Sequence, residues 1–160
     1  ESLLAKNTNK LIWNLRFYPK KADYYLVLIS NHPSDQLEIV RTKCLKLPLY
    51  KGQALELAGI ASTKDEAIDL IIRLSSDTYE SLFYQMPEKQ RMLFLAIARE
   101  GKVKEITGGT FVRKHKLISS SSVNSALKGL LEKDFVTMDK NMYCVYDHFF
   151  VLWLKFKGII

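Results

Sequence analysis

The sequence predicts a mixed α/β fold that is mainly α-helical, with a partial α/β or helical N-terminal part at residues 1–85 and a helix-rich domain at 86–160. An unbroken apolar run at 24–29 has the length of a buried strand. Segments with helical periodicity dominate the second part. The 160-residue chain is 48% apolar and 26% charged, which excludes a disordered chain and a disulfide-stapled mini-protein.

The first part is expected to form the end of an α/β unit. The run at 24–29 is typical of a strand buried on both faces, as in a parallel sheet. A second short strand is expected at 43–47. Helices are predicted at 11–18, 53–60 and 64–74. The last helix would be opened by Ser62 or Thr63, with acidic residues in its first turn.

The second part has clearer helix signals. A helix buried on most sides is predicted at 88–99, after Pro87 and ending at Gly101. A turn at 107–110 precedes a short basic helix at 111–117. Serines at 119–122 supply the N-cap of a third helix. Its core-facing stripe consists of Val123, Ala126, Leu127, Leu130 and Leu131.

A hairpin and a last helix complete the second part. Two runs rich in β-forming residues, at 135–138 and 142–146, enclose a polar turn. Asp147 is expected to cap an apolar helix at 149–156. Three helices followed by a hairpin is the order of a winged helix-turn-helix domain. The third helix would then be the recognition helix, and the hairpin would be the wing.

Positive charge is concentrated in this domain. Residues 87–160 hold 13 Lys and Arg against 7 Asp and Glu, so they carry +6 of the net charge of +7. A basic patch confined to one domain is typical of nucleic-acid-binding proteins, although a solvated lysine-rich surface gives the same count. The candidate DNA-binding residues are Lys114, Lys116, Ser122, Asn124, Ser125, Lys128 and Lys140.

No catalytic or metal-binding constellation is visible in the sequence. It contains no GxxxxGK[ST] phosphate loop, no HExxH or CxxC spacing and no GxSxG turn. Cys44 and Cys144 share no motif spacing and are expected to be reduced thiols in an intracellular protein. Asn31 follows the apolar run, where it would either position a water against a bound phosphate or form a turn before Pro33.

The motifs of the second part resemble the C-terminal region of archaeal and bacterial ATPases of the STAND and AAA+ groups. The resemblance covers residues 86–154 through "MPEKQRMLFLAIAREGKV", "FVRKHKLISSSSVNSALKGLLEKDFV" and "YCVYDHFFVLWLK". It implies a winged-helix module at the end of a switch ATPase and leaves the activity of that module open.

In the first part, "YYLVLISNHP" looks like the sensor-1 strand of such ATPases, and "KCLKLPLYKGQALELAGI" looks like the last core strand leading into the lid helices. This resemblance implies a nucleotide-sensing role for Asn31 and for Arg41 or Arg73. The Walker segments would precede Glu1. ATP and Mg would therefore belong to the parent protein, and the 160 residues alone are expected to hold no cofactor and to lack activity.

The expected function is that of the lid and winged-helix portion of a cytoplasmic, ATP-dependent STAND or AAA+ switch protein. The winged helix would bind double-stranded DNA, or would regulate its own ATPase core. A free-standing winged-helix transcription regulator and a winged-helix protein-interaction module remain alternatives, in which residues 1–80 serve as a small adaptor or as a dimerisation or sensing domain. No run approaches the roughly 20 apolar residues of a membrane span, so no membrane partner is expected.

Overall fold

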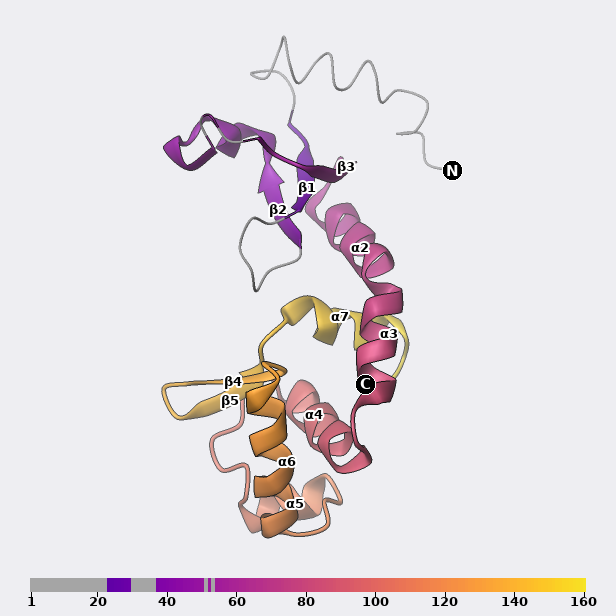
Figure 1. Cartoon of the computed structure of the whole chain (residues 1–160), viewed down its shortest axis with the longest axis vertical. Coiled ribbons are helices and arrows are strands. Elements are labelled where there is room, and N and C mark those ends of the chain that lie inside the picture. The colour runs from indigo at the N-terminus through magenta and orange to yellow at the C-terminus, as the bar shows by residue number, and fades with distance from the viewer. Residues whose placement is uncertain (1–22, 30–36, 51, 53) are drawn as a thin grey trace. The chain divides into compact units, whose positions relative to one another are not determined.

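The computed structural model describes residues 23–29, 37–50, 52 and 54–160 (Figure 1). The chain divides into two compact units, Glu1–Leu74 and Ser75–Ile160. The predicted class, mixed α/β and mainly α, is confirmed. The sequence placed the domain boundary after residue 85, whereas the structure groups residues 75–85 with the second unit.

The described residues of the first unit form a three-stranded antiparallel sheet with helix α2 (Lys64–Leu74) packed on it. Strand β1 (Tyr25–Ile29) lies between β2 (Leu37–Arg41) and β3 (Leu57–Ala61). Helix α2 contacts all three strands. It approaches β3 closely at Gly59, where an added Cβ would require the Leu70 side chain to shift.

The predicted strand at 24–29 is confirmed, but the expected parallel sheet is wrong. The β1 residues Leu26, Val27 and Leu28 are all buried, and β1 pairs antiparallel with both neighbours. A central strand is buried on both faces whenever both faces of the sheet are covered. Here α2 covers one face, and the segment after β2 packs against Leu26 and Leu28 on the other. Continuous burial therefore did not distinguish the two pairing directions.

Two further predictions in the first unit are wrong. The expected strand at 43–47 is a pair of 3-10 turns, η2 (Thr42–Lys46) and η3 (Pro48–Tyr50), and the strand lies just before them. The expected helix at 53–60 is occupied instead by β3. Short apolar runs carry no decisive period, and a glycine in the middle of this one disfavours a helix. The expected helix at 11–18 lies outside the described residues.

The predicted helix at 64–74 is confirmed as α2, together with its cap. The Thr63 hydroxyl accepts a hydrogen bond from the Glu66 backbone N–H at 3.1 Å. The Glu66 carboxylate in turn accepts one from the backbone N–H of Ser62 at 2.8 Å. This reciprocal arrangement satisfies backbone donors that the first turn of a helix leaves open.

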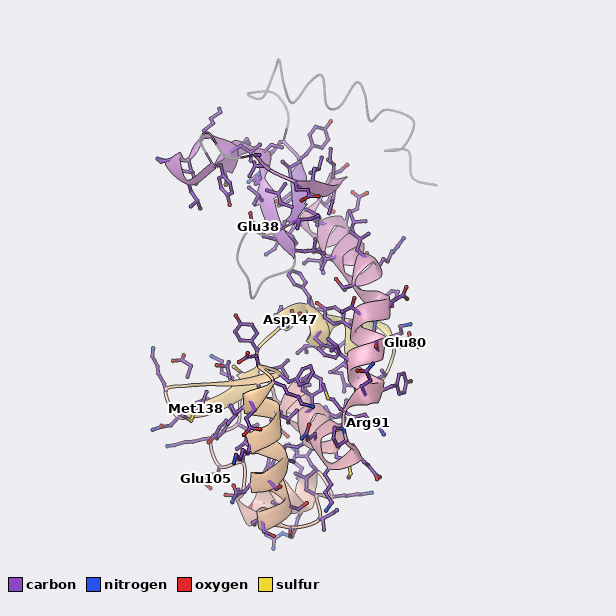
Figure 2. All side chains as sticks on the ribbon, viewed as in Figure 1. Glu38, Glu80, Arg91, Glu105, Met138 and Asp147 are labelled. Carbon is purple, nitrogen blue, oxygen red and sulfur yellow. The ribbon has the colours of Figure 1, made fainter. Side chains whose placement is uncertain are left out.

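The second unit contains the predicted helices and hairpin in the predicted order. They are α4 (Glu88–Glu100), α5 (Gly109–Lys114), α6 (Ser120–Glu132), β4 (Val136–Asp139), β5 (Met142–Val145) and α7 (His148–Phe156). The Ser119 side chain caps α6 by accepting from the Ser122 N–H at 3.2 Å. Asp147 caps α7 by accepting from the Phe149 N–H at 2.8 Å, and Figure 2 labels it at the start of that helix.

The apolar stripe of α6 forms a core with α4, as predicted for all but one residue. The buried members are Val123, Ala126, Leu127 and Leu130. Leu131 is only half-buried, so its predicted core position is wrong. The two helices approach closely at Gly129, where a Cβ would collide with the Gln90 side chain. This packing holds α6 firmly against α4 and leaves its opposite face free.

Two parts of this unit were not predicted. Helix α3 (Ser76–Gln85) joins α7 through an aromatic cluster in which the rings of Tyr79 and Phe150 stack at 4.6 Å. The Tyr79 hydroxyl donates to the Asp147 carboxylate at 2.7 Å, and burial, followed by this hydrogen bond, raises the pKa of Tyr79. In addition, Val103 forms an isolated antiparallel β-bridge with Tyr143 of β5.

Candidate nucleic-acid interface

The exposed face of α6 brings together several of the predicted residues. Asn124, Ser125 and Lys128 are exposed, and they share the i, i+3, i+4, i+7 spacing of one helix face with Ser121. Lys128 lies 3.8 Å from Glu132 across one turn, an exposed pair that constrains it little. The face is polar and built of short side chains around one lysine, so a ligand can approach the helix backbone closely.

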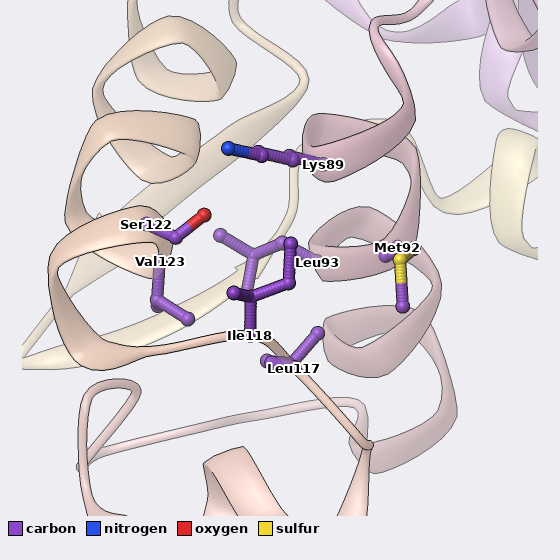
Figure 3. Close-up of a pocket in the computed structure, with 7 residues that line it drawn as sticks. All are labelled: Lys89, Met92, Leu93, Leu117, Ile118, Ser122 and Val123. Atoms are coloured by element: carbon purple, nitrogen blue, oxygen red, sulfur yellow. The ribbon is translucent and has the colours of Figure 1, made fainter.

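Ser122 lies at the border of this face, beside a small apolar cleft. In Figure 3, Lys89 extends from α4 toward Ser122 on α6. The apolar residues that line the cleft are Met92, Leu93, Leu117, Ile118 and Val123. Its volume of about 10 Å³ is room for a single water, so the cleft does not accommodate an organic ligand.

The turn that precedes α6 presents Lys116 in an unusual conformation. Lys116 is exposed, and its φ of 53° lies in the left-handed region that favours glycine. A side chain with a Cβ costs about 1 kcal/mol there. Its backbone N–H donates to the Arg113 carbonyl at 3.1 Å, which is part of the tight end of α5.

The tip of the hairpin also holds residues at positive φ. Asp139 pairs with Met142, so the loop consists of Lys140 and Asn141 alone, with φ values of 48° and 62°. Two positive φ angles define the type I′ turn that joins twisted strands, and Asn-Gly is its preferred sequence. Asparagine adopts positive φ more readily than lysine, because its short polar side chain can hydrogen-bond to the nearby backbone. Both lysines therefore occupy positions where glycine would be less strained.

Lys114, another predicted DNA-binding residue, is held by an acidic partner. Its Nζ lies 2.6 Å from the Glu100 carboxylate, which also accepts a hydrogen bond from His115 Nε2 at 2.8 Å. The hydrogen bonds from Lys114 and then His115 lower the pKa of Glu100. The ring of His115 also lies against Phe111, with centroids 4.7 Å apart. These contacts connect α5 to the end of α4, so Lys114 has a structural role as well.

Two cations that the sequence reasoning missed lie beside the hairpin. Lys102 and Lys104 are exposed on either side of Val103, the residue that pairs with β5. They share a surface hollow with Lys114 and with two carboxylates, Glu100 and Glu105. The Lys-Val-Lys alternation, typical of an edge strand with one buried residue, was the signal that could have identified them.

Two of the three predicted nucleotide-sensing residues, Arg41 and Arg73, lie in the first unit. The Arg41 guanidinium donates twice to Asp23, at 2.7 and 2.6 Å, and Lys43 Nζ lies 3.0 Å from the same carboxylate. These two cations lower the pKa of Asp23 from 3.8 to about 2, with Arg41 the larger cause. Arg73 is exposed on α2 and has no partner among the described residues. Asn31 lies outside the described residues.

The described part of the chain offers no metal-binding cluster and no membrane-spanning helix. Among residues 23–29, 37–50, 52 and 54–160, no group of three His, Cys, Asp or Glu side chains could hold a metal ion. None of the helices there has the length and apolar character needed to span a bilayer. Cys44 and Cys144 are free, half-buried thiols.

Comparison with known proteins identifies the second unit. Residues 77–156, half of the chain, match a family model described as a probable winged helix domain. No curated protein matches the chain, and no solved structure does. The match runs from α3 to α7 and includes the hairpin, so the winged helix and its helix-turn-helix are those predicted from the order of elements.

Proposed function

We propose that this chain, which belongs to the family described as a probable winged helix domain, binds double-stranded DNA through its second unit. The proposed surface, called the α6–wing surface below, comprises the exposed face of α6, the turn before it and the tip of the β4–β5 hairpin. Its residues are Lys116, Ser121, Asn124, Ser125, Lys128 and Lys140.

The conformation of Lys116 and Lys140 is the observation that carries the proposal. Both are exposed lysines at positive φ, one before α6 and one in the hairpin that follows it. Backbone strain at a residue with no local compensation supports a functional role for its side chain. A cation on each of these two turns is suited to phosphate groups that lie on either side of a helix inserted in the major groove.

The charge distribution supports the same partner. The domain carries most of the chain's net charge of +7, and no acidic side chain among the described residues forms an ion pair with Lys116 or Lys140. Phosphate contacts by lysines release counterions, so binding is expected to weaken steeply with salt. With few cations on the surface, we expect affinities in the non-specific range of roughly 10⁻⁴–10⁻⁶ M.

Fluorescence anisotropy with a labelled duplex at low salt tests this function on the full chain. We expect saturable binding that weakens when Lys116→Gly and Lys140→Gly are combined. Because glycine relieves the strain, the double variant should be as stable as the parent, so weaker binding cannot be attributed to unfolding.

A variant matched in charge loss, Lys64→Gln with Lys155→Gln, is the control. Both lysines are exposed and lie outside the α6–wing surface. The control should bind as the parent does. No binding near 100 μM, or equal weakening in the control and in the glycine variant, would overturn the proposed DNA surface in favour of a protein-docking role.

A finer proposal concerns the protein in which the domain acts. The motif phrases at 86–154 support a winged helix at the end of a cytoplasmic STAND or AAA+ switch ATPase, with ATP and Mg bound by that parent alone. Arg73 is then the better candidate for a nucleotide phosphate, because Arg41 is already bound to Asp23. Phosphate release above background from the 160 residues alone would contradict this assignment of the catalytic parts to the parent.

A further inference from the structure

The exposed face of α6 carries one side chain suited to a two-point contact with a base. Asn124 lies in the middle of this face, between Ser121 and Lys128, near the N-terminal end of the helix. Its amide has no hydrogen-bond partner among the described residues. Asparagine is also a weaker helix former than alanine, so local structure does not explain it. N-terminal residues of a recognition helix are the ones that reach base edges.

The neighbours of Asn124 offer no competing base contact of the same kind. Ser121 and Ser125 are short, and a hydroxyl pairs with several bases. Lys128 ends in a flexible, strongly hydrated point charge that suits phosphate. No arginine or glutamine occurs in residues 120–132, so α6 lacks the fork that would pair with guanine and the longer amide that would pair with adenine.

The chemistry of the amide selects one base. In the major groove adenine presents an N6 donor beside an N7 acceptor, which match the amide oxygen and the amide N–H of asparagine. Guanine presents two acceptors, so the amide oxygen would face the O6 oxygen. We infer that Asn124 is a specificity-determining residue that contacts adenine, and that the α6–wing surface prefers duplexes with an A·T pair opposite it. This inference rests on the proposed DNA-binding function.

Selection from a duplex pool with a randomised ten-base-pair centre tests the inference on the full chain. Sequencing of the retained fraction should show adenine enriched at one position, with about fivefold or greater preference over the other bases. Asn124→Ala should remove that enrichment and retain most of the binding. Lys116→Gly should weaken binding to all duplexes alike and leave the enrichment intact.

A chemical probe isolates the contact itself. Replacing the enriched adenine by 7-deazaadenine removes the N7 acceptor, so the parent chain should lose its preference and Asn124→Ala should be unaffected. Retained duplexes without enrichment, or with guanine enriched, would overturn the adenine contact and leave DNA binding intact. If no duplex is retained at all, the proposed function fails and the inference fails with it.

Discussion

Two pairs of exposed cations, one pair in each unit, have different environments. At the end of β2, Arg41 and Lys43 both contact Asp23, so one carboxylate offsets part of their positive charge within the first unit. On the second unit, Lys116 and Lys140 project from strained turns and have no ion-pair partner among the described residues. Net charge alone therefore does not identify a binding surface, and the proposed DNA surface rests on Lys116 and Lys140, which carboxylates of the described residues leave unpaired.

The largest effect is expected in the core of the second unit, which holds the cations of its surface in place. Leu130 of α6 is fully buried, whereas Leu131 is only half-buried. Leu130→Ala should lower the free energy of unfolding by about 2–5 kcal/mol, because a cavity replaces the side chain. Leu131→Ala is the matched control and should cost less. Denaturant melts of both variants measure this, and equal costs would mean that α6 packs differently.

Charge reversal on the α6–wing surface should have the next largest effect. Lys128→Glu combined with Lys140→Glu replaces two favourable phosphate contacts by repulsion, so duplex affinity should fall sharply. The slope of log affinity against log salt should decrease in magnitude by about 2. Lys43→Glu in the first unit is the control for a single charge reversal. If the slope stays unchanged in the double variant, neither lysine contacts phosphate.

Relief of strain gives a smaller effect of opposite sign on stability. Lys140→Gly should leave the free energy of unfolding unchanged or raise it by up to about 1 kcal/mol, since glycine adopts positive φ without a Cβ clash. Lys43→Gly removes the same charge at a position without positive φ, so it should not stabilise the chain. Thermal melts compare them. A clear loss of stability in Lys140→Gly would show that the lysine stabilises the turn.

The ion pairs of Asp23 with Arg41 and Lys43 predict that the stability of the folded state depends weakly on pH in the acid range. The pKa of Asp23 is lowered from 3.8 to about 2 by Arg41 and Lys43. A carboxyl group whose pKa is lowered on folding stabilises the folded state when the pH is above the pKa of the unfolded state. This contribution disappears as the pH falls through the pKa of the folded state. Stability should therefore decrease between about pH 4 and pH 2, by a small amount because the pair is exposed.

Asp23→Asn should flatten this part of the stability curve, as followed by melts at each pH. The variant should also leave duplex binding at neutral pH unchanged, because Asp23 belongs to the first unit. An identical acid dependence in the parent and in Asp23→Asn would mean that the Asp23–Arg41 contact does not persist in solution.

Local signals in the sequence were sufficient for most of the second unit. Helix α4 begins after a proline and ends at a glycine, and a serine and an aspartate cap α6 and α7. The hairpin follows from two runs of β-forming residues around a polar turn. Each of these signals acts within a few residues, so tertiary contacts only reinforced them. The order of these elements then predicted the winged helix, and the polar face of α6 followed from its apolar stripe.

Tertiary structure decided the features that depend on distant residues. The run at 24–29 fits either sheet type, and its antiparallel pairing was set by β2 and β3. The segment at 57–61 became a strand because it pairs with β1, a long-range contact that no local period reveals. Helix α3 joined the second unit through the contacts of Tyr79 with α7.

The candidate site was likewise determined in part by the sequence and in part by the tertiary structure. The sequence determined which residues of α6 are polar and that the second unit carries most of the positive charge. It did not determine which cations are unpaired, because Lys114 is bound by Glu100 from the end of another helix. Nor did it determine that Lys116 and Lys140 adopt positive φ, since backbone conformation in a turn is set by the elements that the turn joins.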